Sequence, residues 1–211
     1  MFVENYINEN NTDLKEQGLV RVLSKGGVID NVHIKNANLT RTSSISGTPA
    51  IGYIGVLVGQ STGGKIINSS ATEAKITASG VLDTIYTGGL VGYGNIVEIN
   101  NSYTNNVDIV INDAIETSIG GILGYETNVG SVTNCYTYGT ITSDNSNLGG
   151  IVGKTKGNVK NNFSFVNISS SSDNIGGIVG NDSTGNNYYV EKNLAIGNIY
   201  SSSSSENIRN I

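Results

Sequence analysis

Tryptophan is absent from this sequence, and proline, cysteine, histidine and methionine each occur once. Because proline cannot donate a hydrogen bond to a neighbouring strand, its near absence is compatible with long runs of strand pairing. The lone cysteine, Cys135, excludes an intramolecular disulfide. The lone histidine, His33, lies far from Cys135 in the sequence, so a Cys–His nucleophilic pair is not indicated. We expect Cys135 to be buried and inert.

Charge is also scarce, at 14% of residues, and the net charge is −5 without any run of Lys and Arg. A polyanion therefore has no cationic surface to bind, and we expect no nucleic-acid partner. No apolar run approaches the length of about 18 residues that suggests a membrane-spanning helix. Residues 1–17 are polar and acidic and do not have the pattern of an export signal. We therefore expect no membrane insertion by this chain.

The abundant residues are Ile and Val together with Gly, Ser, Thr and Asn. This composition favours strands joined by tight turns over helices. At 211 residues the chain is long enough for one domain with a sizeable core. The sequence predicts a single all-β domain.

A short aliphatic block with glycines around it occurs five times, and its final glycines are 27 to 33 residues apart. No helical period follows these blocks, so they are not phosphate-binding loops. We expect glycine there because the chain turns sharply, often with positive φ, and because neighbouring backbones approach closely. The predicted corner residues are Gly59, Gly88, Gly89, Gly92, Gly120, Gly121, Gly124, Gly149, Gly150, Gly153, Gly176, Gly177 and Gly180.

Two further blocks complete each repeat. One has an asparagine two positions before an aromatic residue, and the other is a short strand such as the one around Ile141. Each strand alone is too short to bury an apolar face, so the repeats must stack. We expect a single-stranded parallel β-solenoid, a right-handed β-helix with about six coils of three short strands. The predicted structural column of asparagine and aromatic residues is Asn101, Tyr103, Asn134, Tyr136, Asn161 and Phe163.

The direction of these side chains stays open. If the asparagines point inward, their amides form a ladder from coil to coil, and if they point outward, Cys135 lies inside. The aromatic column is expected to be packing, with an exposed stripe that binds sugar or protein as the alternative. His33 occupies the place of Tyr136 in its repeat, so we expect a packed ring there.

The ends of the chain depart from the repeat. Residues 1–17 are predicted to be an N-terminal cap or a lead-in, and a short helix is one form that the cap could take. Residues 18–200 form the predicted solenoid. Residues 201–211 begin with five serines, which is typical of a flexible linker or tail.

The glycine blocks resemble the GLUG motif, a short Gly-Leu-Val/Ile-Gly core found in repeats of bacterial secreted and surface proteins. The resemblance covers about residues 50 to 200. The arrangement of these repeats is similar to the repeat region ahead of the catalytic domain in Gram-positive zinc metalloproteases of the immunoglobulin A protease type. The resemblance implies a noncatalytic segment, secreted or on the cell surface, with a downstream catalytic domain. Those proteases carry a His-Glu-x-x-His zinc site, which a chain with one histidine cannot form.

Our first functional hypothesis is therefore a spacer or substrate-recognition segment of such a protease, with a host protein such as immunoglobulin as partner. The alternative is an adhesin or surface binding module for protein or glycan, with no protease attached. A carbohydrate-cleaving β-helix is disfavoured, because the carboxylates, such as Asp108 and Asp113, lie scattered in variable segments. The sequence indicates no catalytic residue, metal site or cofactor, and assigns no binding residue.

Overall fold

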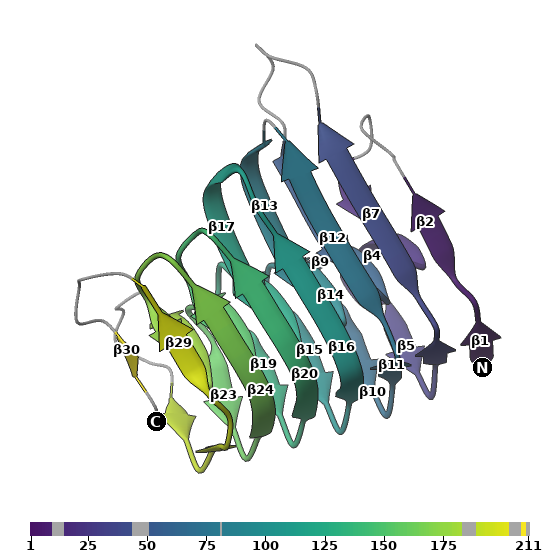
Figure 1. Cartoon of the computed structure of the whole chain (residues 1–211). Coiled ribbons are helices and arrows are strands. Elements are labelled where there is room, and N and C mark those ends of the chain that lie inside the picture. The colour runs from purple at the N-terminus through teal and green to yellow at the C-terminus, as the bar shows by residue number, and fades with distance from the viewer. Residues whose placement is uncertain (10–14, 44–50, 81, 183–188, 203–207, 210–211) are drawn as a thin grey trace.

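The computed structural model describes residues 1–9, 15–43, 51–80, 82–182, 189–202 and 208–209. Within these residues the regular structure consists of short strands, β1 to β30, paired in parallel in four sheets. The chain passes through the four sheets in turn, so that each strand lies beside its equivalent in the next coil (Figure 1). No helix capable of crossing a membrane occurs in these ranges.

We name the sheets A to D in the order in which the chain visits them. Sheets C and D each have six strands, which corresponds to six complete coils. A partial seventh coil adds strands to sheets A and B only. The bounds of the strands in sheets A and B are as follows. Sheet A contains β1 (Phe2–Glu4), β2 (Ile7–Glu9), β6 (His33–Lys35), β7 (Asn38–Ser43), β11 (Ser70–Thr72), β12 (Lys75–Gly80), β16 (Tyr103–Ile111), β20 (Tyr136–Ser143), β24 (Phe163–Ser170), β28 (Leu194–Ala195) and β29 (Ile199–Ser201); sheet B contains β3 (Glu16–Gln17), β8 (Ile51–Gly55), β13 (Leu82–Gly88), β17 (Ala114–Gly120), β21 (Leu148–Gly149), β25 (Ile175–Gly176) and β30 (Ile208–Arg209).

Sheets C and D form the remainder of each coil, which returns the chain to sheet A. Sheet C contains β4 (Val20–Ser24), β9 (Val58–Thr62), β14 (Val91–Gly94), β18 (Leu123–Glu126), β22 (Val152–Thr155) and β26 (Val179–Asp182); sheet D contains β5 (Val28–Asp30), β10 (Lys65–Ile67), β15 (Glu98–Asn100), β19 (Ser131–Thr133), β23 (Asn158–Lys160) and β27 (Val190–Glu191). In Figure 1 sheet A runs upward on the near side while the coils advance from right to left, so the helix is right-handed. The predicted parallel β-solenoid is confirmed.

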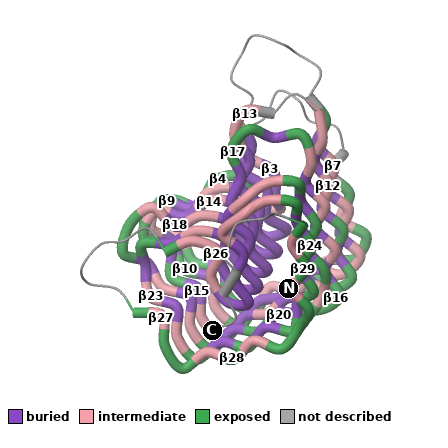
Figure 2. The backbone as a smooth tube through the Cα atoms, turned by 60° about the vertical axis from the view of Figure 1, so that its left-hand side comes forward, coloured by how far each residue is buried: buried purple, intermediate pink, exposed green. Residues whose placement is uncertain are grey.

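The core consists of aliphatic side chains stacked in register from coil to coil. Ile109, Ile141 and Ile168 pair in adjacent strands of sheet A, and each is 1% exposed. Alternate residues of a strand face opposite sides. Most inward positions are apolar, although some are small and polar, such as Thr104, Thr137 and Ser164 in sheet A. Burying each aliphatic side chain contributes about 1.5–3 kcal/mol. Buried residues accordingly fill the interior of the stack (Figure 2).

Each complete coil passes through four sheets, whereas the repeat blocks predict three strands in each coil. The difference arises because two of the blocks cross a corner. Gly88 ends β13 in sheet B, and Val91 begins β14 in sheet C, so one glycine block contributes to two sheets. The block that contains Asn134 likewise joins β19 in sheet D to β20 in sheet A.

The glycine corners depend on close backbone contact. A Cβ atom on Gly149 would lie 1.9 Å from the carbonyl oxygen of Val152, and one on Gly88 would lie 2.1 Å from that of Val91. Among the described glycines, positive φ occurs at Gly26, Gly63, Gly80 and Gly139. The expectation of positive φ in the glycine blocks is therefore wrong, and close approach of sheets B and C is the reason for glycine.

The structure corrects the prediction of a separate cap or lead-in at residues 1–17. Where it is described, this segment contributes β1, β2 and β3 to the first coil instead of a capping helix. At the other end, Ser201 belongs to β29, and β30 pairs with β25. Solenoid pairing thus extends beyond the predicted boundary at residue 200. Residues 203–207, 210 and 211 of the predicted linker lie outside the described ranges.

Candidate binding site on sheet A

Aromatic and aliphatic side chains form two rows on the outer face of sheet A. Strict alternation in β20 and β24 directs alternate side chains outward from the buried positions. The first row runs through Tyr103, Tyr136, Phe163 and Leu194, which pair in register. We call both rows together the aromatic stripe: Tyr103, Tyr136 (42% exposed), Tyr138 (54%), Phe163 (43%), Phe165 (39%), Leu194 (45%) and Ile196 (52%).

Four of the five rings of the stripe form two pairs. Tyr103 and Tyr136 are stacked with centroids 4.6 Å apart and an interplanar angle of 5°. Phe163 and Phe165 are stacked at 5.7 Å. An open pocket of about 340 Å³ lies where the two pairs meet, lined by Asn134, Cys135, Tyr136, Asn161, Phe163 and Phe165.

The asparagines of this site lie at the corner between sheets D and A. Asn101, Asn134 and Asn161 adopt left-handed φ values of 49°, 55° and 57°, a conformation that asparagine accepts more readily than most residues. Their side chains point to solvent. Within the described residues these three amides have no hydrogen-bond partner, whereas the equivalent Asn68 donates to Asp30 at 3.0 Å. Two of the three free amides, those of Asn134 and Asn161, line the pocket.

Cys135 faces the interior, which resolves the alternative left open by the sequence. The residue after the corner position points inward, and in four coils its side-chain oxygen accepts a hydrogen bond from the backbone N–H of its equivalent one coil earlier. Asn162 Oδ1 accepts from Cys135 at 2.9 Å, and Asn193 Oδ1 accepts from Asn162 at 2.9 Å. Ser69 and Ser102 do the same in earlier coils, each at 3.1 Å. The ladder expected for inward-pointing Asn101, Asn134 and Asn161 is therefore not formed, because these side chains point outward. The inward acceptors lie one position later, and two of them are asparagines, Asn162 and Asn193.

Burial in the core keeps Cys135 unreactive. Burial raises the pKa of its thiol to about 12, against hydrogen bonds from backbone groups that lower it. The thiolate is the nucleophilic form of cysteine, so almost no reactive species exists at neutral pH.

One segment of the solenoid matches a known family. Residues 51–77 match the GLUG motif. This match begins at β8 in sheet B, continues through sheets C and D, and ends in β12 of sheet A, so a GLUG repeat is one coil of the solenoid. The resemblance predicted from the glycine blocks is confirmed.

Among solved structures, a candidate immunoglobulin A1 protease from Bacteroides ovatus is similar, with a TM-score of 0.67 and 21% sequence identity. The alignment covers 96% of this chain and 57% of that one. At 21% identity, this similarity shows a shared fold and nothing about function. No curated protein matches the chain significantly.

Tyrosines also gather on strands of sheets B and C, in a cluster that the sequence analysis missed. Tyr53 stacks on Tyr86 at 5.6 Å and on Tyr93 at 4.6 Å, and Tyr125 meets Tyr86 edge-on at 5.0 Å. Burial, followed by the charge of Glu116, raises the pKa of Tyr86. A signal was present, because Tyr93 and Tyr125 each directly follow the last glycine of a block. Since Tyr53 and Tyr86 are each 8% exposed, this cluster is mainly packing.

Glu126 is a second residue that the sequence analysis missed. Its carboxylate is buried at the corner between sheets C and D and accepts hydrogen bonds from the backbone N–H groups of Ile96 at 2.7 Å, Val97 at 3.3 Å and Asn128 at 3.3 Å. Burial raises its pKa to about 7, although these hydrogen bonds lower it. The carboxylate thus holds the corners of two successive coils together.

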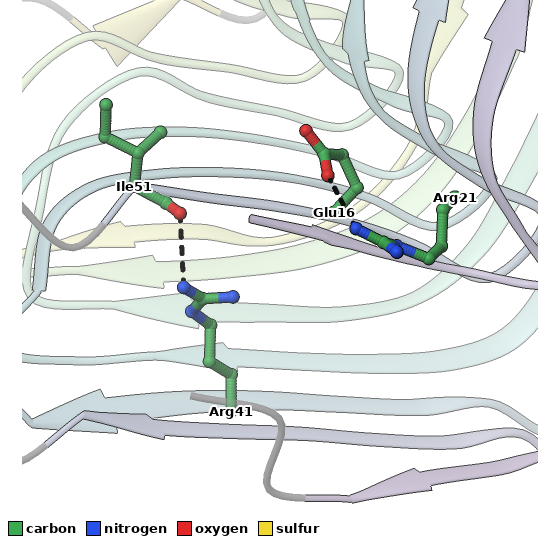
Figure 3. A network of polar contacts seen from close by, with 4 residues as sticks. All are labelled: Glu16, Arg21, Arg41 and Ile51. Carbon is green, nitrogen blue, oxygen red and sulfur yellow. Dashed lines mark hydrogen bonds and ion pairs between the residues drawn. The ribbon is translucent and has the colours of Figure 1, made fainter. Parts of the chain in front are cut away.

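A buried arginine lies near the N-terminal end of the solenoid. Arg41 is 2% exposed and donates to the carbonyl oxygen of Ile51 at 3.1 Å (Figure 3). Burial lowers the pKa of Arg41, and the charge of Glu16 opposes this effect. Glu16 also pairs with Arg21 at 3.4 Å. The Arg41–Ile51 hydrogen bond lies within the second coil, and the Glu16–Arg21 pair lies within the first.

The other titratable residues named in the sequence analysis, His33, Asp108 and Asp113, belong to the framework of the solenoid. His33 is half-buried, with ring nitrogens 2.8 Å from the hydroxyl of Ser70 and 2.9 Å from the amide oxygen of Asn31. Asp108 accepts a hydrogen bond from Thr140 in sheet A, and Asp113 lies at the corner after β16. Across the described ranges, no three His, Cys, Asp or Glu side chains group together in a way that could hold a metal ion.

Proposed function

We propose that this chain is a noncatalytic recognition segment of a larger secreted or cell-surface bacterial protein, and that it binds its partner through the aromatic stripe. The observation that carries this proposal is the exposure of the stripe itself. The solvent face of a one-sided sheet usually carries polar residues, and contiguous exposed apolar patches mark interaction sites. Here six exposed aromatic or aliphatic side chains and the half-buried Tyr103 extend over four coils.

The comparisons support a parent protein of a particular kind. The chain spans 57% of the Bacteroides ovatus protein that is named as a candidate immunoglobulin A1 protease. In a parent of this type, the solenoid would bind a host protein such as immunoglobulin while a separate domain supplies the catalytic residues. A role as spacer is compatible with the same rod.

The test is binding of immunoglobulin A to the immobilised chain, measured by surface plasmon resonance. We expect the double variant Tyr136→Ser and Phe163→Ser to lose binding, because both rings lie at the centre of the stripe. Tyr200→Ser is the matched control, since Tyr200 is an exposed aromatic residue of β29 outside the stripe. Equal binding by all variants, or none by the native chain, would exclude recognition of immunoglobulin through the stripe.

An adhesin without a protease is the second candidate, because the stripe and its pocket are complete within this chain. The parent reading frame separates the two. A His-Glu-x-x-His motif elsewhere in that frame supports the protease, and its absence supports the adhesin.

A further inference from the structure

We infer that the aromatic stripe binds an uncharged glycan, with one sugar ring seated in the pocket at Tyr136 and Phe163. This inference rests on the proposed recognition role and specifies its ligand class. The observations that support it are the geometry of the rings, the free amides beside them and the lack of charge in the pocket.

The ring geometry leaves an opening of suitable shape. Tyr136 and Phe163 are register partners in adjacent strands, yet Tyr136 stacks on Tyr103 and Phe163 stacks on Phe165. The aromatic column therefore divides between these two coils, and the pocket lies at the division. A pyranose ring presents an apolar face of C–H groups that packs on an aromatic ring, as is usual in largely apolar sites with a few placed polar groups.

The polar groups at the pocket match sugar hydroxyls. Each hydroxyl both donates and accepts hydrogen bonds, and so does each asparagine amide. The amides of Asn134 and Asn161 are exposed and without partners in the described structure, and the left-handed corner fixes where each side chain begins. Because the amides repeat with the coils, about 4.8 Å apart, they offer similar contacts along the stripe.

The electrostatics favour an uncharged ligand. None of the six residues that line the pocket carries a charge at neutral pH. Lys160, which precedes Asn161, pairs with Glu191 at 3.0 Å and lies over the ring of Tyr189. Lys192 follows in the next coil at the corner position equivalent to Asn161, outside the pocket lining. An acidic sugar or peptide would thus bury its charge without a cation in the pocket, which costs free energy.

The experiment is a binding measurement by saturation-transfer NMR and calorimetry with neutral oligosaccharides of glucose, mannose, galactose and N-acetylglucosamine, and with oligogalacturonate as the acidic probe. We expect binding of at least one neutral oligosaccharide. Phe163→Ala and Asn161→Gly should each weaken it about tenfold. Glycine accepts the left-handed corner, so Asn161→Gly removes the amide without straining the backbone. Tyr200→Ala and Asn68→Gly, the equivalent changes outside the pocket, should leave binding unchanged.

The inference is wrong if no neutral oligosaccharide binds, if oligogalacturonate binds more tightly, or if the two pocket variants bind as the native chain does. A parallel measurement with immunoglobulin A, before and after enzymatic removal of its glycans, separates this failure from that of the proposed function. Stripe-dependent binding of the deglycosylated protein would retain the recognition role and refute the glycan. Loss of both kinds of binding would refute both.

Discussion

Raising the pH should destabilise this protein through Glu126. The carboxyl group is buried, and its pKa rises from an ordinary 4.5 to about 7 in the folded chain. When the pKa of a group is higher in the folded chain than in the unfolded chain, the stability that this difference provides is fully present at a pH below the unfolded pKa. It is lost as the pH rises through the folded pKa. The difference between the two pKa values corresponds to about 3 kcal/mol. The free energy of unfolding should therefore fall by about this amount between pH 4.5 and pH 8.

The measurement is urea unfolding at several pH values across this range, followed by circular dichroism. Glu126→Gln cannot ionise but keeps the size and one acceptor oxygen of the native side chain. We expect its stability to vary little over the same range, so that the variant is the more stable protein at pH 8. Glu98→Gln is the control, because Glu98 is half-exposed and pairs with Lys65 at the surface, where such pairs contribute about 1 kcal/mol at most.

A native protein whose stability does not change with pH would refute the reasoning, as would a Glu126→Gln variant that retains the decline. Either result would mean that the three backbone N–H groups stabilise the carboxylate more than burial destabilises it.

Three further predictions concern the interior. Gly149→Ala should lower the free energy of unfolding by about 3 kcal/mol, because the added methyl group clashes with Val152. The control Gly26→Ala places a methyl group in open space at a φ of 81° and should lower it by about 1 kcal/mol. Equal losses in urea unfolding would contradict close approach as the reason for glycine at position 149. Asn162→Ala should cost about 2–3 kcal/mol because Cys135 N–H loses its buried acceptor, and exposed Asn161→Ala about 1 kcal/mol; the reverse order would place the ladder at Asn161. Cys135 should resist iodoacetamide in the native protein at pH 8 and react in urea, as mass spectrometry can follow; rapid native labelling would show that its burial is incomplete.

The coils could be predicted from the sequence because five of them carry the glycine block. Stacking puts like residues over like, as Ile109, Ile141 and Ile168 show. The number of sheets could not be predicted in the same way. A block such as the one from Gly88 to Gly92 reads as one short strand, although it bends between two sheets.

The direction of the side chains was harder to predict, because a corner breaks the alternation of a strand. Val132 and Cys135 both face inward although an odd number of positions separates them. The left-handed φ of Asn134 changes the phase between them. Period-two reasoning correctly puts Asn134 and Tyr136 on one face, but it puts Val132 there too, so it could not decide whether that face is exposed. Glu126 and the tyrosine cluster depend on contacts between coils, which a single repeat does not reveal.

The stacking of the coils has a consequence for how far the molecule reaches. One coil of about thirty residues advances the rod by about 4.8 Å, whereas the same residues in an extended linker would reach about 100 Å. A chain selected only to separate two domains would gain more distance from a far shorter segment. What the coils add with each turn is another strip of ordered outer surface, which is what a recognition segment requires.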